Sequence, residues 1–594
     1  MLNPRNKKDR LNYGELLAPP EGYVLTKAVG TTYSLDLYAL LAIPVAMFYA
    51  KSMEGDFQQN RYDVLDAIRQ SKDKVDLFCQ RGKIQVPSKY NSLLAFMEDC
   101  IEEVTPWIEN SSFHPKIWVL RFEKGKEQVF RLIVLSRNLT FDRSWDIAYF
   151  AEGVPAKSNA ESQKLSKYLS YFYAKTKRVA EPNFLKNLGN VEFKNADGFS
   201  DFEIYPILGF EKNIHKYPNP LAEAYYEDML IISPFVDAKT LAFLKRSNKH
   251  LSLFSREEEL DKLTKEDLKD IDCYCMNSLI VNGEDFLDSE ENEPLSQNLH
   301  AKLFIGQNKK MTDWYMGSAN CTSPAYDRNA EILIKISSKL PQCSIAEIKK
   351  TLLDEKYSVF TEYVSTEIET NNEEVSLEKA IRDFSFKLTK VIFKGTAYER
   401  EQGDNFNITI EADLRGIKKD RFGVKAHLVH RDTDRQEIIC GVANNIEFEN
   451  ISLSNLSKYL VLTIYDEKED LKRLLVKMDL IIPEEREDTI FNELINSKLK
   501  FFQYLQFILN PDQYTDSLEI GQNKPSIGKT ENETLQNILG ANTSIYESLM
   551  LAASRSPRKL NEIDGIITRL QKLNSEVVSD FLPIWTVFKE FAHA

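Results

Sequence analysis

The chain has 594 residues, a formal net charge of −14 and seven cysteines. Its length predicts three or four domains, each able to bury its own core. The odd number of cysteines, without framework spacing, indicates a reducing compartment. The polar first ten residues and a longest apolar run of only 37–50 predict neither a signal peptide nor a membrane span. We therefore expect a cytoplasmic protein that does not associate with membranes.

Residues 1–190 form the first of two similar segments. Apolar and β-branched runs predict a helix at 34–50 and strands at 75–79, 117–122, 129–135 and 146–151. Around the later strands lie His114-Pro-Lys116, Ser136-Arg-Asn138 and Asp146. We expect His114 and Lys116, like the His and Lys of the second copy, to lie two residues apart on a strand and so to share one face.

Residues 191–340 repeat this arrangement. The predicted elements are strands at 229–235, 251–254, 299–305, 314–317 and 331–336, and helices at 238–247 and 257–269, with an acidic loop at 283–293. The second half carries His300-Ala-Lys302, Gly317-Ser-Ala-Asn320 and Glu331. Strands that alternate with helices indicate an α/β sheet.

The two copies agree in order and spacing. The intervals from His to Asn are 24 and 20 residues, and those from His to the carboxylate are 32 and 31. A single His-x-Lys is a weak signal, but two copies with matched trailing elements indicate a duplication. We therefore expect one active site built from two half-sites.

The residue types suit attack on a phosphodiester. A neutral imidazole is a good nucleophile, and a second imidazole can protonate the leaving oxygen. Lys116, Lys302, Asn138 and Asn320, with Ser136 and Ser318, would donate hydrogen bonds to the phosphate oxygens. Either carboxylate, Asp146 or Glu331, can fix an imidazole's tautomer. This design requires no metal and no cofactor.

These paired motifs resemble those of the phospholipase D superfamily, and Gly317-Ser-Ala-Asn320 is similar to its Gly-Ser-x-Asn element. The resemblance covers about the first 340 residues. It implies two pseudo-symmetric halves, each a mixed sheet flanked by helices, with the site at their junction. It also implies a covalent phosphohistidine intermediate, with His114 as the nucleophile and His300 as the acid.

The superfamily's common motif has an Asp seven residues after the His, where this chain has Arg121 and Gln307. Its tyrosyl-DNA phosphodiesterase branch and several bacterial nucleases also lack that Asp. The resemblance therefore favours a nuclease that cleaves DNA, in restriction or anti-phage defence. Basic residues near the motifs are the expected substrate-binding groups, namely Arg121, Arg137, Arg143 and Arg328.

The remainder of the chain carries no chemical motif. We predict a helical linker at 341–384, a β-sandwich-like domain at 385–482 and a helical C-terminal domain at 488–594. Such domains would recognise substrate or dock a partner such as a helicase or another defence-system protein. Two alternatives remain open: a phospholipid phosphodiesterase or transferase, and a non-cleaving DNA-binding subunit that recruits a helicase.

Overall fold

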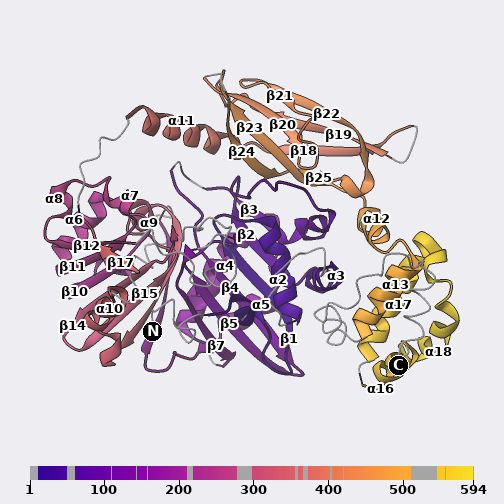
Figure 1. Cartoon of the computed structure of the whole chain (residues 1–594), viewed down its shortest axis with the longest axis horizontal. Helices are drawn as coiled ribbons and strands as arrows, with labels where there is room; N and C mark the ends of the chain where they lie inside the picture. Colours follow the sequence, from indigo (N-terminus) through magenta and orange to yellow (C-terminus); the bar gives the residue numbers. More distant parts are fainter. Residues whose placement is uncertain are drawn as a thin grey trace, which may run out of the picture.

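The computed structural model describes residues 11–592 apart from 50–60, 107, 109, 142–143, 157, 210–218, 277–297, 355–358, 365–371, 402–404, 419–420, 468, 510–544 and 556. The α/β class is confirmed: two mixed sheets lie side by side, the β-rich domain lies above them and the C-terminal helices lie beside the first half (Figure 1). The expected acidic loop at 283–293 lies outside the described residues.

The first sheet has three parallel strands followed by antiparallel ones. Its order is β3 (Ile101–Val104), β2 (Val75–Gln80), β1 (Val24–Thr32), β4 (Ile117–Lys124), β5 (Glu127–Leu135), β7 (Ala148–Pro155) and β8 (Val191–Phe193). Its helices are α1 (Tyr13–Leu17), α2 (Leu37–Tyr49), α3 (Arg61–Ser71), α4 (Ala160–Ala174) and α5 (Pro182–Leu188), with a 3-10 helix at Ser92–Cys100.

The second sheet repeats this pattern. Its order is β17 (Phe360–Glu362), β12 (Ile271–Met276), β11 (Asn248–Ser255), β10 (Tyr226–Ile232), β14 (Leu303–Asn308), β15 (Met311–Gly317), β16 (Ala330–Ser338) and β9 (Ser200–Leu208). Its helices are α6 (Ala238–Ser247), α7 (Glu257–Leu260), α8 (Lys265–Leu268), α9 (Ser323–Asp327) and α10 (Ile345–Leu352).

Three local predictions for the second half differ from the structure. The helix expected over 257–269 is two short helices, because Thr264 is the N-cap of α8 and the helix is interrupted before it. In the linker predicted to be helical over 341–384, α10 ends at Leu352 and β17 then pairs with β12. The second sheet therefore extends past the predicted boundary at residue 340.

The two sheets share one apolar core. Buried side chains of the first sheet, such as Val119 and Phe130, pack in the same cluster as Ile305 and Trp314 of the second. Burial of such side chains contributes roughly 25 cal/mol per Å² of apolar surface. This shared core holds the two halves in a fixed relation, which is a requirement for a site at their junction.

The accessory domain, residues 385–482, contains two four-stranded sheets. One is β22 (Ala443–Ser452), β19 (Asn405–Asp413), β18 (Phe393–Glu399) and β25 (Asp479–Ile481); the other is β21 (Gln436–Ile438), β20 (Gly423–Leu428), β23 (Tyr459–Tyr465) and β24 (Asp470–Lys477). Helix α11 (Asn372–Thr389) precedes it and supplies Phe384 and Leu388 to its core.

The C-terminal helices pack against the first half. They are α12 (Glu485–Leu494), α13 (Lys498–Leu509), α16 (Ile545–Arg555), α17 (Pro557–Val578) and α18 (Leu582–Ala592). Phe491 and Leu560 lie in the same apolar cluster as Leu40 of α2. A buried ion pair, Arg486 to Glu98 at 2.7 Å, joins α12 to the 3-10 helix of the first half.

Candidate active site between the two halves

The two halves exchange backbone hydrogen bonds at the motifs. The His114 amide donates to the Ala330 carbonyl at 3.0 Å, and the His300 amide donates to the Trp145 carbonyl at 3.0 Å. Ala330 and Trp145 directly precede the two carboxylate residues. Each histidine is therefore held by the segment that carries the carboxylate of the other half. A parallel pair of short strands, β6 (Ser144–Trp145) and β13 (Asn298–Leu299), is part of this exchange.

The expectation that each His and Lys share a strand is wrong. β4 begins at Ile117 and β14 at Leu303, so both His-x-Lys triplets precede their strands. Each lysine instead turns back along the chain: Lys116 Nζ donates to the His114 carbonyl, and Lys302 Nζ to the His300 carbonyl, both at 2.8 Å. The backbones of these triplets form hydrogen bonds to the other half, in place of the strand-to-strand hydrogen bonds that the alternating sequence pattern predicts.

Glu331 is the centre of the hydrogen-bond network. His114 Nδ1 lies 2.9 Å from Glu331 Oε2, and the Ser318 hydroxyl donates to the same oxygen. Asn329 Nδ2 donates to Oε1 at 3.0 Å. Because a carboxylate only accepts, the Nδ1 of His114 carries the proton, and Nε2 of the neutral ring keeps its lone pair. That is the tautomer a nucleophilic imidazole needs.

Burial governs the ionisation of this site. It lowers the pKa of His114 to about 4, although the charge of Glu331 opposes that shift. Burial also lowers the pKa of Lys302 to about 8, and burial with the nearby Lys302 charge lowers the pKa of Lys116 well below its usual value. His114 is therefore neutral near pH 7.

The two serines have a structural role that the sequence did not predict. Ser136 Oγ accepts from the Ile147 amide at 2.8 Å, and Ser318 Oγ accepts from the Ile332 amide at 3.0 Å. In each half the serine thus ties the end of one strand to the residue after the carboxylate. This matched role explains why both copies have serine there, and it does not need phosphate contact.

The two asparagines follow these serines. Asn138 Oδ1 accepts from the Ser34 amide at 3.4 Å. Asn320 Oδ1 is buried and has no hydrogen-bond partner among the described residues. Their amide groups remain candidate donors to a phosphate.

Asp146 is the counterpart of Glu331 in the first half. It accepts from the Ser144 hydroxyl at 2.9 Å and lies 3.5 Å from Arg137 Nη1. Of the four arginines expected to bind substrate, Arg137 is thus brought to the edge of the site. Arg143 lies outside the described residues.

Arg121, expected to bind substrate, is paired with two carboxylates of the first half. Its guanidinium lies 2.8 Å from Glu181 and 3.1 Å from Glu123, and its side chain is 8% exposed. It lies on β4 facing α5, where burial requires a paired charge. Arg328 pairs with its neighbour Asp327 at 3.4 Å and lines a cavity next to the site.

Sequence reasoning missed three residues around the site. Tyr33 places its ring edge-on to His114, with 5.2 Å between ring centroids. Arg256 donates twice to the Leu299 carbonyl, which directly precedes His300. Asn329 orients Glu331 as described above, and its position two residues before the carboxylate is the signal that was available in the sequence.

A second matched pair of hydrogen bonds, one in each half, supports the ends of the strands. Thr32 Oγ1 accepts from the Leu139 amide, and Ser233 Oγ accepts from the Cys321 amide, at 3.0 and 2.9 Å. Thr32 is the last residue of β1 and Ser233 directly follows β10, and Leu139 and Cys321 directly follow the motif asparagines. In the sequence, each of these hydroxyl residues stands four positions before an aspartate, Asp36 or Asp237. This repeat is a sequence signal of the matched hydrogen bonds.

The described residues hold no group of three His, Cys, Asp or Glu side chains arranged to bind a metal ion. In the part of the chain that the structure describes, no helix combines the length and apolar character needed to cross a membrane.

Comparisons with known proteins give matches to solved structures alone. No family model matches the chain, and a search of curated proteins found no match. Among solved structures, the chain is similar to phosphatidylserine synthase of Haemophilus influenzae Rd KW20, with 11% identity and a TM-score of 0.36, over 64% of this chain and 91% of that one. It is also similar to polyphosphate kinase of Porphyromonas gingivalis, with 10% identity and a TM-score of 0.32, over 63% and 50%. At this level of identity neither likeness says which reaction this chain performs.

Proposed function

We propose that this protein is a metal-independent phosphodiesterase of the phospholipase D type that cleaves nucleic acid through a phosphohistidine. The observation that supports this best is the hydrogen bond from His114 Nδ1 to Glu331 across the two halves, beside the buried Lys116 and Lys302. It combines a neutral nucleophile with two lysines that can donate hydrogen bonds to phosphate oxygens.

In the first step, Nε2 of His114 attacks phosphorus. The N–P bond forms as the P–O bond to the leaving oxygen breaks, and His300 in its imidazolium form gives that oxygen a proton. Glu331 stabilises the positive charge that develops on the His114 ring. Lys116 and Lys302, with the side-chain amides of Asn138 and Asn320, stabilise the charge on the pentacoordinate phosphorus.

In the second step, water attacks the phosphohistidine. His300, now neutral, takes a proton from the water, the new P–O bond forms, and the N–P bond breaks to restore neutral His114. Every proton that leaves His300 in the first step returns to it in the second. The cycle therefore consumes one water per bond cleaved.

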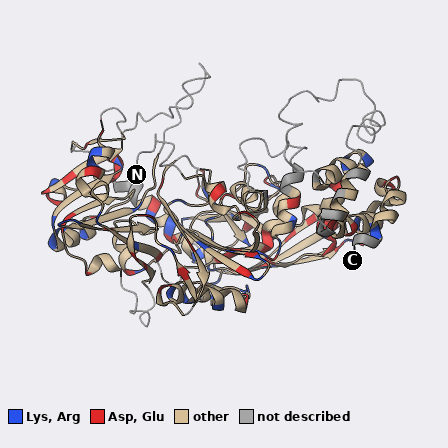
Figure 2. Cartoon of the chain, turned by 90° about the horizontal axis from the view of Figure 1, so that it is seen from below, with Lys and Arg blue, Asp and Glu red and all other residues tan. Residues whose placement is uncertain are grey.

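Nucleic acid is the proposed substrate because cationic side chains collect near the site while the net charge of the whole chain is −14. Acidic and basic residues are interspersed over the rest of the molecule (Figure 2). Binding of phosphates depends on such local clusters rather than on net charge. DNA as the target, a role in anti-phage or restriction defence, and docking of a helicase by residues 341–594 belong to the same proposal.

The test is cleavage of labelled single- and double-stranded DNA, RNA and phosphatidylcholine in excess EDTA. We expect cleavage of nucleic acid by the wild type and by His250→Ala, whose histidine is exposed on β11, and none by His114→Ala or His300→Ala. Mass spectrometry of quenched wild type should find phosphate on the His114 peptide. Cleavage that needs a divalent ion, or turnover of phosphatidylcholine alone, would contradict the proposal.

A further inference from the structure

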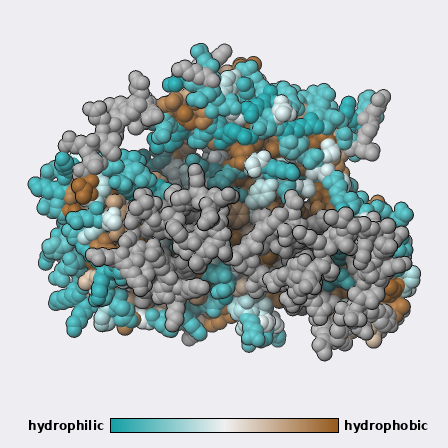
Figure 3. All heavy atoms as spheres, in the orientation of Figure 1, coloured by the Kyte–Doolittle hydropathy of each residue, from teal (hydrophilic) through white to brown (hydrophobic). Residues whose placement is uncertain are grey.

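A basic cavity of about 470 Å³ lies beside His114 and is lined from three parts of the chain. Tyr33 and Lys83 come from the first half, Arg328 and Asn329 from the second, and Arg382 and Lys472 from α11 and the accessory domain. Tyr33 contacts the His114 ring and Asn329 binds Glu331, so the cavity adjoins the site. In the space-filling view the molecule is hollowed beneath the accessory domain (Figure 3).

The charges of this cavity are poorly compensated. Among the described residues, Asp383 is the one acidic residue in its lining, whereas Arg81, Lys83, Arg328, Lys379, Arg382 and Lys472 also line it. Arg81 forms an ion pair with Glu103, and Arg328 with Asp327. Within the described chain, four cations of the lining form no ion pair: Lys83, Lys379, Arg382 and Lys472. Burial and the nearby charges of Lys83 and Arg382 lower the pKa of Lys472 to about 8. Cations held together without counter-ions favour an anionic ligand.

The accessory domain is fixed in the position that forms this cavity. Arg81 Nη2 donates to the Val391 carbonyl at 3.1 Å, and an isolated β-bridge joins Ile84 to Leu475 of β24. Lys477 Nζ donates to the Ile101 carbonyl at 2.7 Å. These contacts hold Lys472 and Arg382 opposite Lys83 before any ligand arrives.

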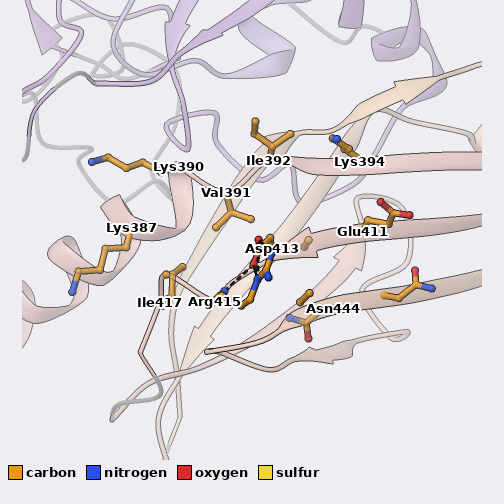
Figure 4. Close-up of a pocket in the computed structure, with 14 residues that line it drawn as sticks. Lys387, Lys390, Val391, Ile392, Lys394, Glu411, Asp413, Arg415, Ile417 and Asn444 are labelled. Atoms are coloured by element: carbon orange, nitrogen blue, oxygen red, sulfur yellow. Dashed lines mark hydrogen bonds and ion pairs between the residues drawn. The ribbon is translucent and has the colours of Figure 1, made fainter.

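A larger cavity, of about 770 Å³, provides a contrast (Figure 4). It is lined by Lys387 and Lys390 near the end of α11 and by the accessory sheet. There the lining carboxylates Glu411 and Asp413 offset part of the positive charge, and Asp413 binds Arg415 directly at 2.6 Å. None of its lining residues belongs to the catalytic site, so it serves as an internal control.

We propose that the basic cavity binds phosphates of a polynucleotide strand next to the phosphate that His114 attacks, with Arg382 and Lys472 as the contacts supplied from outside the two halves. This inference rests on the proposed function and adds a positioning site to it. A strand is favoured over a phospholipid because the lining is basic and polar, with few apolar side chains to receive an acyl chain. A polynucleotide strand also carries several phosphates, so it can occupy the basic cavity and the candidate active site at the same time.

The test separates binding from cleavage by using full-length protein that carries His300→Ala. The probe is a fluorescein-labelled oligodeoxynucleotide of about 20 nucleotides, long enough to cover one single-strand site, followed by anisotropy over a range of salt concentrations. The test variant adds Arg382→Ala and Lys472→Ala. The matched control adds Lys387→Ala and Lys390→Ala, which remove the same charge from the other cavity.

We expect the test pair to weaken binding about tenfold or more, because each lost side chain removes a charged phosphate contact. The slope of log K against log salt should fall by about 1.4, which corresponds to two phosphates of a single strand. The control pair should bind as the parent does. Equal weakening by both pairs, or none, would overturn the inference, as would binding of phosphatidylglycerol vesicles in place of the oligonucleotide.

The two proposals fail in different ways. If the wild type cleaves no nucleic acid but the test pair alone weakens binding, the cavity remains a strand site and the proposed reaction is wrong. If the wild type cleaves nucleic acid but the test pair binds the oligonucleotide as the control pair does, the cavity is not a substrate site.

Discussion

Nδ1 of His114 lies 2.9 Å from a carboxylate oxygen of Glu331, a residue 217 positions later in the other half of the chain. The carboxylate that orients the first histidine therefore comes from the second motif. A half separated from its partner would lose either His114 or the carboxylate that fixes its tautomer. The candidate site therefore needs both halves, and one chain contains both.

Glu331→Gln tests the orienting role. We expect kcat to fall about 100-fold or more, because an amide cannot stabilise the imidazolium-like charge and can impose the wrong tautomer. Steady-state kinetics on labelled DNA would measure this. Glu203→Gln, on β9 of the same sheet and paired with Lys335, should keep near wild-type kcat. A loss of less than about threefold in Glu331→Gln would exclude Glu331 from the mechanism.

The ionisation of Lys302 predicts a pH dependence of anion binding. Its pKa of about 8 means that the ammonium is present below pH 8 and is lost as the pH rises through that value. Inorganic phosphate, used as a competitive inhibitor, should therefore bind more weakly above pH 8, up to about tenfold per pH unit. The inhibition constant measured across this range checks it. An inhibition constant that stays level well above pH 8 would show that Lys302 does not hold phosphate.

The buried ion pair between Arg486 and Glu98 predicts a large effect on stability. Their side chains are 4% and 0% exposed, and Glu98 also accepts from Ser457. Arg486→Met should lower the free energy of unfolding by about 3–5 kcal/mol, because it leaves a buried carboxylate without its cation. Denaturant unfolding measures this. Glu98→Gln combined with Arg486→Met should cost less than the single change, and a larger cost would refute the ion-pair explanation.

Arg121→Met separates structure from substrate binding. Loss of the pair with Glu181 should destabilise the fold by about 1–3 kcal/mol. The kcat/KM on DNA should stay within about twofold of wild type, because the guanidinium faces α5 and not the site. Thermal unfolding and kinetics on the same preparation give both values. A selective rise in KM without loss of stability would restore Arg121 as a substrate-binding residue.

The motif residues were found from the sequence because duplication repeats both their identity and their order. The β-branched runs before and after them also predicted the strands, since alternation along a strand is a local property. The local patterns failed at the two His-x-Lys triplets. The backbones of these triplets form hydrogen bonds to Ala330 and Trp145 of the other half. The residues next to each triplet in the sequence therefore gave no indication of these contacts.

The sequence by itself determined the α/β class, the two matched halves and the residue types of the site, because these depend on local spacing and composition. Only the tertiary structure decided that Glu331 serves His114, that Arg121 pairs with Glu181, and that Lys83, Arg382 and Lys472 meet in one cavity. Those contacts join segments separated by tens to hundreds of residues. The packing of the two sheets and the accessory domain selects them, and no periodicity along the chain specifies which distant charges meet.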